Sequence, residues 1–321
     1  MSKSAFVFAL PVALLSAAAV LTNSPAQAQN GSLTRSFVSS SGVDTNACTI
    51  TAPCATFAEA YTKIAANGIV AALDPGKYGP ITIAGPVTIN GNGWAAITAP
   101  AQGAGITINA VSGNVTLTGI EIDGAGTAYQ GIVFNTGSGL TISNCIVKDF
   151  VENVGDVTTG RGIWIAPTTG TINFAITNTV AVNNAVSGIS YFPHIGNATV
   201  IGVIDHVVAT DNYNGIDVDS MRNAGSAAVS ISNSIASNNS NIGIAVGTVD
   251  TVTIDNSQIS NNSTGVNISG TLLLGRSTIT ENSLHGLQNF GTINSFQNNQ
   301  VYENGNDNAV GGAALNPITT Q

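Results

Sequence analysis

Glycine followed by an aliphatic residue recurs along most of this chain, and each such pair opens a short run in which apolar and polar positions alternate. The eight pairs begin at Gly105, Gly131, Gly162, Gly188, Gly215, Gly243, Gly265 and Gly286. Successive pairs are 26, 31, 26, 27, 28, 22 and 21 residues apart. Apolar residues at every second position indicate β-strands, and a unit repeated at this period is typical of a solenoid.

Asparagine recurs with the same period at two positions of a second strand-like segment. The last position of that segment holds Asn184, Asn212, Asn239, Asn262, Asn282 and Asn304, with Phe150 in the first coil. An inner position holds Asn144, Asn178, Asn233, Asn256 and Asn298, with His206 and Arg276 as exceptions. Asparagine tolerates the left-handed backbone of a sharp turn, and its amide can bond the coils above and below. We therefore expect asparagine ladders that stabilise turns and do not bind a ligand.

No apolar repeat of 3.6 residues runs through this region, so helices are not expected there. The pattern predicts an all-β chain folded as a right-handed parallel β-helix over residues 81–308, with three short strands in each coil. Residues 29–80 lead into the coils, and their segment 56–66 is predicted to be a helix that caps the N-terminal end. Residues 309–321 are expected to form a loose C-terminal tail.

Residues 1–28 differ from the rest of the chain and are predicted to be a secretory signal peptide. Lys3 precedes an apolar run, and Ala26-Gln27-Ala28 has the small-x-small pattern of a cleavage site. No later stretch is apolar and long enough to span a bilayer, so no transmembrane segment is expected. The mature protein is therefore expected to be secreted or periplasmic.

Charge and cysteine content narrow the partners and the compartment. Only 8% of the residues are charged and the formal net charge is −9, so nucleic acid is not an expected partner. A polyanionic sugar would also be repelled unless a cation bridged it to the protein. Cys48 and Cys54 are predicted to form a small-loop disulfide in an oxidising compartment, with a metal site as the less favoured alternative. Cys145 is predicted to be a buried thiol.

One zone of the glycine-led strands carries the candidate chemistry. Alternation directs Trp164 outward, then Phe192 on the next coil, then Asp217 and Asp219 on the coil after that. A solvated aromatic ring beside carboxylates suits a sugar, because the ring covers the apolar face of a pyranose. Long connections at 151–161, 192–200 and 220–228 could wall a cleft there. The residues predicted to bind substrate are Trp164, Phe192, His194 and Arg161.

The candidate catalytic residues are Asp217, Asp219 and Arg222. Two carboxylates two residues apart on one strand face, about 6–7 Å from each other, could serve as an acid and a base that straddle a water molecule. Alternatively, Asp217 and Asp219 could hold Ca²⁺ that bridges to a uronate, with an arginine abstracting the proton. A third interpretation is that the acidic residues only keep an exposed strand soluble. Asp205 and His206 are not expected to form a dyad, because alternation separates their side chains.

Two segments resemble secreted β-helix proteins of the pectate-lyase-like superfamily. They are residues 37–78, with FVSSSGVDTNACTITAPCATFAEA and ALDPGKY, and the coils from Ile81 to Asn304. The resemblance implies the β-helix fold and a polysaccharide partner, in a superfamily of lyases, hydrolases, epimerases, tailspikes and adhesins. The N-T-D, D-D, G-H-G and R-I-K motifs of polygalacturonases and the D-P-H-D motif of uronan epimerases are absent.

The resulting hypothesis is an exported carbohydrate-directed β-helix protein that cleaves or modifies a polysaccharide in an outward groove. If it is an enzyme, a polysaccharide lyase or a glycoside hydrolase is expected, with Ca²⁺ as the cofactor that the acidic pair could hold. The alternative is a non-catalytic secreted solenoid that binds glycans or acts as a surface adhesin. The sequence leaves the choice between catalysis and binding open.

Overall fold

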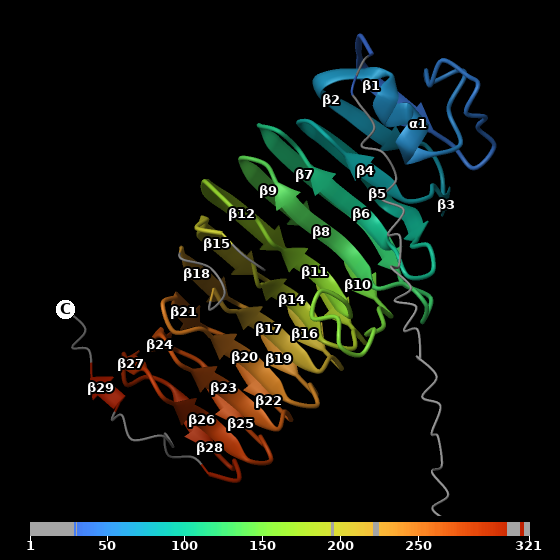
Figure 1. Ribbon diagram of the computed structural model, residues 1–321. Helices are drawn as coiled ribbons and strands as arrows, with labels where there is room; N and C mark the ends of the chain where they lie inside the picture. Colours follow the sequence, from blue (N-terminus) through green and yellow to red (C-terminus); the bar gives the residue numbers. More distant parts are fainter. Residues whose placement is uncertain (1–28, 30, 194–195, 221–224, 307–314, 318–321) are drawn as a thin grey trace, which may run out of the picture.

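The computed structural model describes residues 29, 31–193, 196–220, 225–306 and 315–317. The predicted signal peptide and most of the predicted tail lie outside these residues. The chain is wound into stacked coils, and the strands of successive coils lie side by side along an elongated molecule (Figure 1). Neighbouring coils pair in parallel. The architecture is a right-handed parallel β-helix, as the repeat predicts.

Two sheets form the walls of the coils in the described residues. Sheet A has nine strands: β4 (Ile81–Ile83), β6 (Ala104–Asn109), β8 (Gln130–Thr136), β11 (Arg161–Ile165), β14 (Ser187–Tyr191), β17 (Asn214–Val218), β20 (Ile242–Val246), β23 (Thr264–Ile268) and β26 (His285–Asn289). All eight predicted glycine-led strands belong to this sheet, so the repeat identified one whole wall of the β-helix.

Sheet B has twenty strands and forms the rest of each coil. Its first strands are β1 (Leu33–Val38), β2 (Ile64–Ala72), β3 (Gly76–Lys77), β5 (Val87–Thr98), β7 (Asn114–Asp123), β9 (Gly139–Ser143) and β10 (Ile146–Lys148). Later coils add β12 (Thr171–Thr177), β13 (Val180–Val182), β15 (Thr199–Asp205), β16 (Val208–Thr210), β18 (Ser226–Ser232), β19 (Ile235–Ser237), β21 (Thr251–Asp255), β22 (Gln258–Ser260), β24 (Thr271–Gly275), β25 (Thr278–Thr280), β27 (Thr292–Ser295), β28 (Gln300–Tyr302) and β29 (Leu315–Pro317). From β11 to β28 each coil supplies one strand to sheet A and two to sheet B, which confirms the three-strand coils.

The last asparagine of each coil forms a buried ladder. Asn239, which is 1% exposed, donates from Nδ2 to Oδ1 of Asn262 at 2.9 Å, and its Oδ1 accepts from Nδ2 of Asn212 at 3.1 Å. Each amide also bonds a carbonyl of the preceding coil, as Asn239 does with Ala209 at 3.1 Å. The predicted ladder is therefore confirmed, and it joins the coils through side chains as well as through strand pairing.

The ladder explains why glycine opens each sheet A strand. A Cβ at Gly215 would lie 2.6 Å from the carbonyl oxygen of Gly243 and 2.8 Å from Nδ2 of Asn239. Neither atom can move without breaking the strand pairing or the ladder. Glycine and asparagine therefore recur together because they occupy one crowded corner of the coil.

The backbone reason given for the outer asparagines needs a correction. The residue before each ladder asparagine has the left-handed conformation, for example Asn183 with φ 55°, Asp211 with φ 56° and Asn261 with φ 56°. The ladder residue itself faces inward. At the inner position the prediction is right, because Asn178, with φ 48°, and its equivalents are left-handed. In the last coil this role passes to Gln297, with φ 61°.

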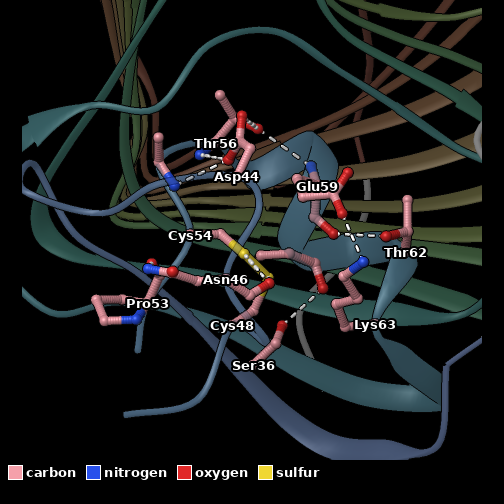
Figure 2. The surroundings of a disulfide bond; sticks show 12 residues. Ser36, Asp44, Asn46, Cys48, Pro53, Cys54, Thr56, Glu59, Thr62 and Lys63 are labelled. Carbon is pink, nitrogen blue, oxygen red and sulfur yellow. Dashed lines mark hydrogen bonds and ion pairs between the residues drawn. A yellow bond between two sulfur atoms is a disulfide. The ribbon is translucent and has the colours of Figure 1, made fainter. Parts of the chain in front are cut away.

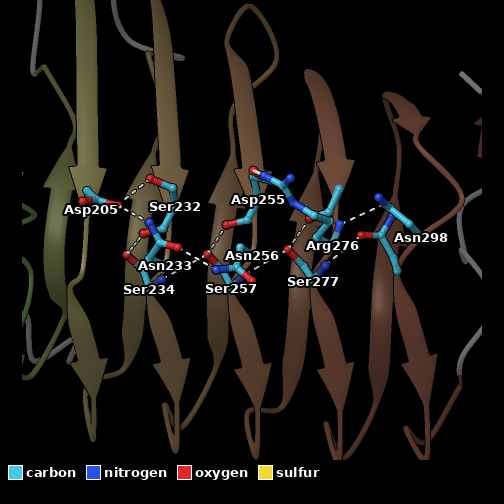
Figure 3. Close-up of polar contacts among 12 residues, drawn as sticks. Asp205, Ser232, Asn233, Ser234, Asp255, Asn256, Ser257, Arg276, Ser277 and Asn298 are labelled. Carbon is cyan, nitrogen blue, oxygen red and sulfur yellow. Dashed lines mark hydrogen bonds and ion pairs between the residues drawn. The ribbon is translucent and has the colours of Figure 1, made fainter. Parts of the chain in front are cut away.

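A serine ladder runs beside the inner asparagines, and the sequence pattern did not reveal it. The backbone N–H of Ser234 donates to the hydroxyl of Ser257 at 3.2 Å, and Ser257 donates in the same way to Ser277 at 3.2 Å (Figure 3). Each hydroxyl donates back to a carbonyl of its own coil. These buried serines satisfy turn N–H groups that would otherwise lack an acceptor.

A short helix and a disulfide lie in the segment that precedes the coils (Figure 2). The helix α1 (Phe57–Thr62) is shorter than the predicted 56–66, because Ile64 already begins β2. The Thr56 hydroxyl caps it by accepting from the N–H of Glu59 at 3.1 Å. The predicted disulfide between Cys48 and Cys54 is present. Across the described residues, no helix has both the length and the apolar character that a bilayer span requires.

Inward side chains of both sheets form one continuous apolar core. Isoleucine, valine and leucine fill it along most of its length, and the largest fully buried rings are those of Tyr61, Tyr78, Tyr191, Phe57, Phe134 and Phe150. Cys145 belongs to this core as a free thiol, as predicted, and burial raises its pKa to about 11. The core leaves the outer faces of the sheets as the places where function can reside.

Candidate functional site

Four of the predicted site residues meet on the outer face of sheet A. The guanidinium carbon of Arg161 lies 4.7 Å from the ring centroid of Phe192 and 5.9 Å from that of Trp164. Its Nη1 is 4.0 Å from Oδ2 of Asp217. Strand register brings these side chains together, because Trp164 pairs with Ser190 and Ser190 pairs with Asp217 on consecutive strands.

Arg161 is the hub of this cluster. It begins β11, and its Nη1 donates to the hydroxyl of Ser190 at 2.6 Å. Nη2 and Nε donate to the carbonyl of Val157 at 3.0 and 3.3 Å, which ties the connection before β11 to the sheet. The side chain is buried, and burial lowers its pKa against the opposing effect of Asp217.

The prediction that Trp164 is a solvated aromatic ring is wrong. Trp164 is only 8% exposed, and its Nε1 donates to the carbonyl of Phe192 at 2.8 Å. Its ring packs with Val133, Ala166 and the partly buried Phe192. The alternation did place Trp164 on the outer face, but these neighbouring side chains cover its ring. An open sheet face cannot be inferred from alternation alone.

Asp217 is the chemically unusual residue of the cluster. Its side chain is 13% exposed, and burial raises its pKa to about 7. The positive charge of Arg161 opposes this rise, whereas the carboxylates of Asp219 and Asp250 add to it. A carboxyl with this pKa exchanges protons at neutral pH, which is the property required of a general acid or base.

Asp250 was missed by the sequence analysis, and no motif marks it. It is 1% exposed and binds both ends of the connection between β17 and β18. Its Oδ2 accepts from the N–H of Ser220 at 2.9 Å, its Oδ1 accepts from the N–H of Ala227 at 2.7 Å, and the Ser220 hydroxyl also donates to Oδ1. A Cβ at Gly247 would lie 2.6 Å from Asp250 and 2.7 Å from Asp219, so these carboxylates crowd one glycine.

No protein-family model and no curated protein matches the chain. Among solved structures, a pectate lyase, Pel9A, superposes with a TM-score of 0.52 and 16% sequence identity over 89% of this chain and 74% of that chain. The fold is a pectate-lyase-like β-helix. The A-modules of the Azotobacter vinelandii mannuronan C-5 epimerases AlgE4 and AlgE6 have TM-scores of 0.47 and 0.45 at 15% identity. They cover 75% and 79% of this chain, and the chain covers 82% and 88% of them. At these identities the likeness extends to the fold alone.

Two predicted site residues of this pectate-lyase-like β-helix, His194 and Arg222, lie outside the described residues. The calcium prediction can be tested against the residues that are described. Ca²⁺ takes six to eight oxygen ligands. Asp217 and Asp219 supply two carboxylates, and the oxygens of Asp250 already accept hydrogen bonds from Ser220 and Ala227. No group of three His, Cys, Asp or Glu side chains in the described residues is placed to hold a metal. Among the described residues, these two carboxylates alone do not complete the ligand set of the ion.

The expectation that Asp205 and His206 lie apart is wrong. Nδ1 of His206 lies 2.7 Å from Oδ2 of Asp205, although alternation predicted opposite faces. His206 has the left-handed conformation, with φ 53°, which turns its side chain back toward the preceding residue. The same carboxylate accepts from Ser232 and Asn233, each at 2.7 Å, so it belongs to the lateral polar ladder of Figure 3. The pair is part of a structural network.

Proposed function

We propose that this chain is an exported, carbohydrate-directed β-helix that acts on a glycan at the outer face of sheet A, beside Asp217 and Asp219. The observation that carries the proposal is the Asp217 carboxyl, which is held 4.0 Å from a buried arginine and has a pKa of about 7. The disulfide suits an oxidising compartment outside the cytoplasm. The fold shared with a pectate lyase supports a polysaccharide as the partner.

Two neighbouring carboxylates support hydrolysis as the proposed reaction. In this scheme Asp217 donates its proton to the leaving glycosidic oxygen, while water attacks the anomeric carbon and transfers its proton to Asp219. The bond to the leaving oxygen breaks as the bond to the water oxygen forms. Of the two arginines considered as the base of an elimination, Arg161 is buried among Phe192, Ser190 and Val157, and Arg222 lies outside the described residues. Arg161 therefore serves as a positioning residue that orients Asp217.

The roles predicted for the aromatic residues change accordingly. Trp164 and Phe192 enclose the guanidinium of Arg161, so they support the ion pair and do not offer a stacking surface. Enclosure in an apolar setting strengthens the interaction between Arg161 and Asp217 and raises the energetic penalty for leaving either one charged alone. The carboxyl of Asp217 and that of Asp219 are the groups proposed to meet the sugar.

An activity screen of the mature protein tests this proposal. We would incubate it with pectate, alginate and neutral plant and bacterial glycans, with and without Ca²⁺, and follow reducing ends and unsaturated uronate together. Hydrolysis predicts new reducing ends without unsaturated product, and Asp217→Asn should abolish them while far-UV circular dichroism stays unchanged. Asp123→Asn, on the outer face of sheet B, is the matched control and should retain activity. Unsaturated product would instead establish a lyase, and no product on any glycan would leave only the binding function.

A further inference from the structure

A groove of about 560 Å³ lies along the turns that lead into the strands of sheet A. We call it the turn groove, and it is lined by Asp149, Asn183, Asp211 and Asn238, with Val151 and Tyr213 beside them. The first four residues have the left-handed conformation, with φ of 65°, 55°, 56° and 56°, and each belongs to a different consecutive coil. The groove is separate from the ion pair of Arg161 and Asp217, since neither residue lines it.

The four left-handed residues form a regular polar track. Adjacent coils are about 4.8 Å apart, so four of them span about 14 Å. Asn183 Nδ2 donates to Oδ1 of Asp149 at 2.7 Å, which fixes the first two side chains relative to each other. A linear polymer lying along the β-helix axis would meet one hydrogen-bonding side chain per coil. This periodicity favours a chain of repeating hydroxylated units over a compact small molecule.

Tyr213 supplies an apolar surface in the same groove. It is 50% exposed, so about half of the side chain is open to solvent at the groove. Its backbone N–H donates to the carbonyl of Asn184 at 3.3 Å, and its carbonyl accepts from Asn241 at 2.9 Å, so the residue is fixed at the floor while the ring remains accessible. Aromatic rings placed in this way cover the C–H face of a pyranose.

A buried acceptor without a partner lies at the start of the asparagine ladder. Asn184 is 1% exposed and lines the groove, and its Oδ1 accepts no hydrogen bond within the described structure. In every later rung Oδ1 accepts from the asparagine of the preceding coil, but here that coil has Phe150, whose side chain cannot donate. A buried acceptor left unsatisfied is costly, and this one lies where the ladder begins beside the groove.

The charge of the groove selects among sugars. Asp149 and Asp211 both line it, and no lysine or arginine of the described chain does. The protein as a whole carries a formal charge of −9. A uronate polymer would be repelled, whereas neutral hydroxyls can donate to carboxylates through strong hydrogen bonds.

We propose that the turn groove is a glycan-binding site for a linear, neutral oligosaccharide that lies along the coils, with one sugar ring on Tyr213. The inference rests on the proposed carbohydrate function only for the class of ligand, because binding in the groove requires no step at Asp217. It gives the protein a means of holding a polymer beside the face on which Asp217 lies.

Isothermal titration calorimetry of the mature protein tests this site. The ligands are four neutral hexasaccharides (cellohexaose, mannohexaose, xylohexaose and chitohexaose) and the acidic hexagalacturonate. At least one neutral hexasaccharide should bind, and hexagalacturonate should not. Tyr213→Ala should weaken that binding by about tenfold or more, as expected for an aromatic anchor. Tyr302→Ala is the matched control, because Tyr302 is 43% exposed but lies on β28, away from the groove. Asp149→Asn/Asp211→Asn should allow hexagalacturonate to bind.

The outcomes separate this site from the proposed reaction. Failure of all four neutral hexasaccharides to bind, or unchanged binding by Tyr213→Ala, would overturn the turn groove as a glycan site whatever the activity screen shows. Asp217→Asn should bind the hexasaccharide as the wild type does and lose only turnover. If Tyr213→Ala loses binding while no variant and no wild-type sample releases product, the groove stands and the proposed reaction fails.

Discussion

Replacing Asp217 by asparagine should make this protein more stable at neutral and alkaline pH. The carboxyl has a pKa of about 7 in the folded chain, whereas an aspartate in the unfolded chain has a pKa near 3.8. The folded state therefore binds the proton more tightly than the unfolded state. The stabilisation that the protonated Asp217 carboxyl contributes is fully present below about pH 4 and is lost as the pH rises through about 7. The change in pKa corresponds to about 4 kcal/mol between the two limits.

Asparagine keeps the shape of the side chain and cannot ionise, so it should remove this part of the pH dependence. We would measure urea unfolding by far-UV circular dichroism at pH 3, pH 7 and pH 8.5 for the wild type and Asp217→Asn. The variant should match the wild type at the lowest pH and exceed it at the highest by up to about 4 kcal/mol. Loss of the charge partner of Arg161 reduces this gain, because the buried guanidinium then lacks the nearest carboxylate that balances its charge.

Asp205 provides a control with the opposite sign. Hydrogen bonds from Ser232, Asn233 and His206 lower its pKa to about 2, so its charged form stabilises the fold above about pH 4. Asp205→Asn should therefore destabilise the protein at neutral pH and have little effect near pH 2. If Asp217→Asn also proves less stable than the wild type at pH 8.5, the reasoning is wrong. The carboxylate would then be stabilised by Arg161 more strongly than it is destabilised by burial.

Three further predictions test the coil and its loops. Asn262→Ala removes four ladder hydrogen bonds and should lower the free energy of unfolding, measured in urea, by about 4 kcal/mol. The neighbouring variant Asn261→Gly should change it by less than about 1 kcal/mol, and similar losses for both variants would refute the role of the ladder. Gly215→Ala places a Cβ 2.6 Å from a carbonyl of the next coil and should lower the melting temperature; an unchanged melting temperature would contradict that crowding. Arg161→Lys loses the paired bonds to Val157 and should speed proteolytic cleavage in residues 151–160; equal cleavage rates would show that the arginine does not hold this connection.

The fold could be predicted because each coil repeats the same local requirements. Three residues recur in register in the coils: a glycine that faces the ladder, an aliphatic residue that faces the core and an asparagine at the corner. A correct prediction for one coil therefore applies to the others. Gly215 and Asn239 illustrate this, since each is required by the other. The disulfide between Cys48 and Cys54 could also be predicted, because the two cysteines are only 6 residues apart in the sequence.

The site was only half predictable, because it depends on parts of the chain that do not repeat. Alternation correctly placed Trp164 and Asp217 on one face, but Trp164 is buried by side chains packed around it, including Phe192 beyond the end of β14, which no period describes. Likewise, the left-handed backbone of His206 turns its side chain toward Asp205, although alternation predicts that the two side chains lie on opposite faces. The turn groove was missed for the same reason, because the left-handed residues stand one position before the ladder asparagines and face the opposite way.

The outward-facing residues in register with Asp217 show that the β-helix fold does not require the cluster around Asp217. In register with Asp217, the next two coils carry Ala245 and then Asn267, and the β-helix continues through them without change. A buried ion pair commonly contributes no more stability than apolar residues of the same volume. The chain nevertheless places a carboxyl where burial opposes its charge, and it surrounds the neighbouring guanidinium with two aromatic rings. Residues that break the local rules of an otherwise regular fold are the ones whose presence is best explained by function, and in this β-helix that reasoning leads to Asp217.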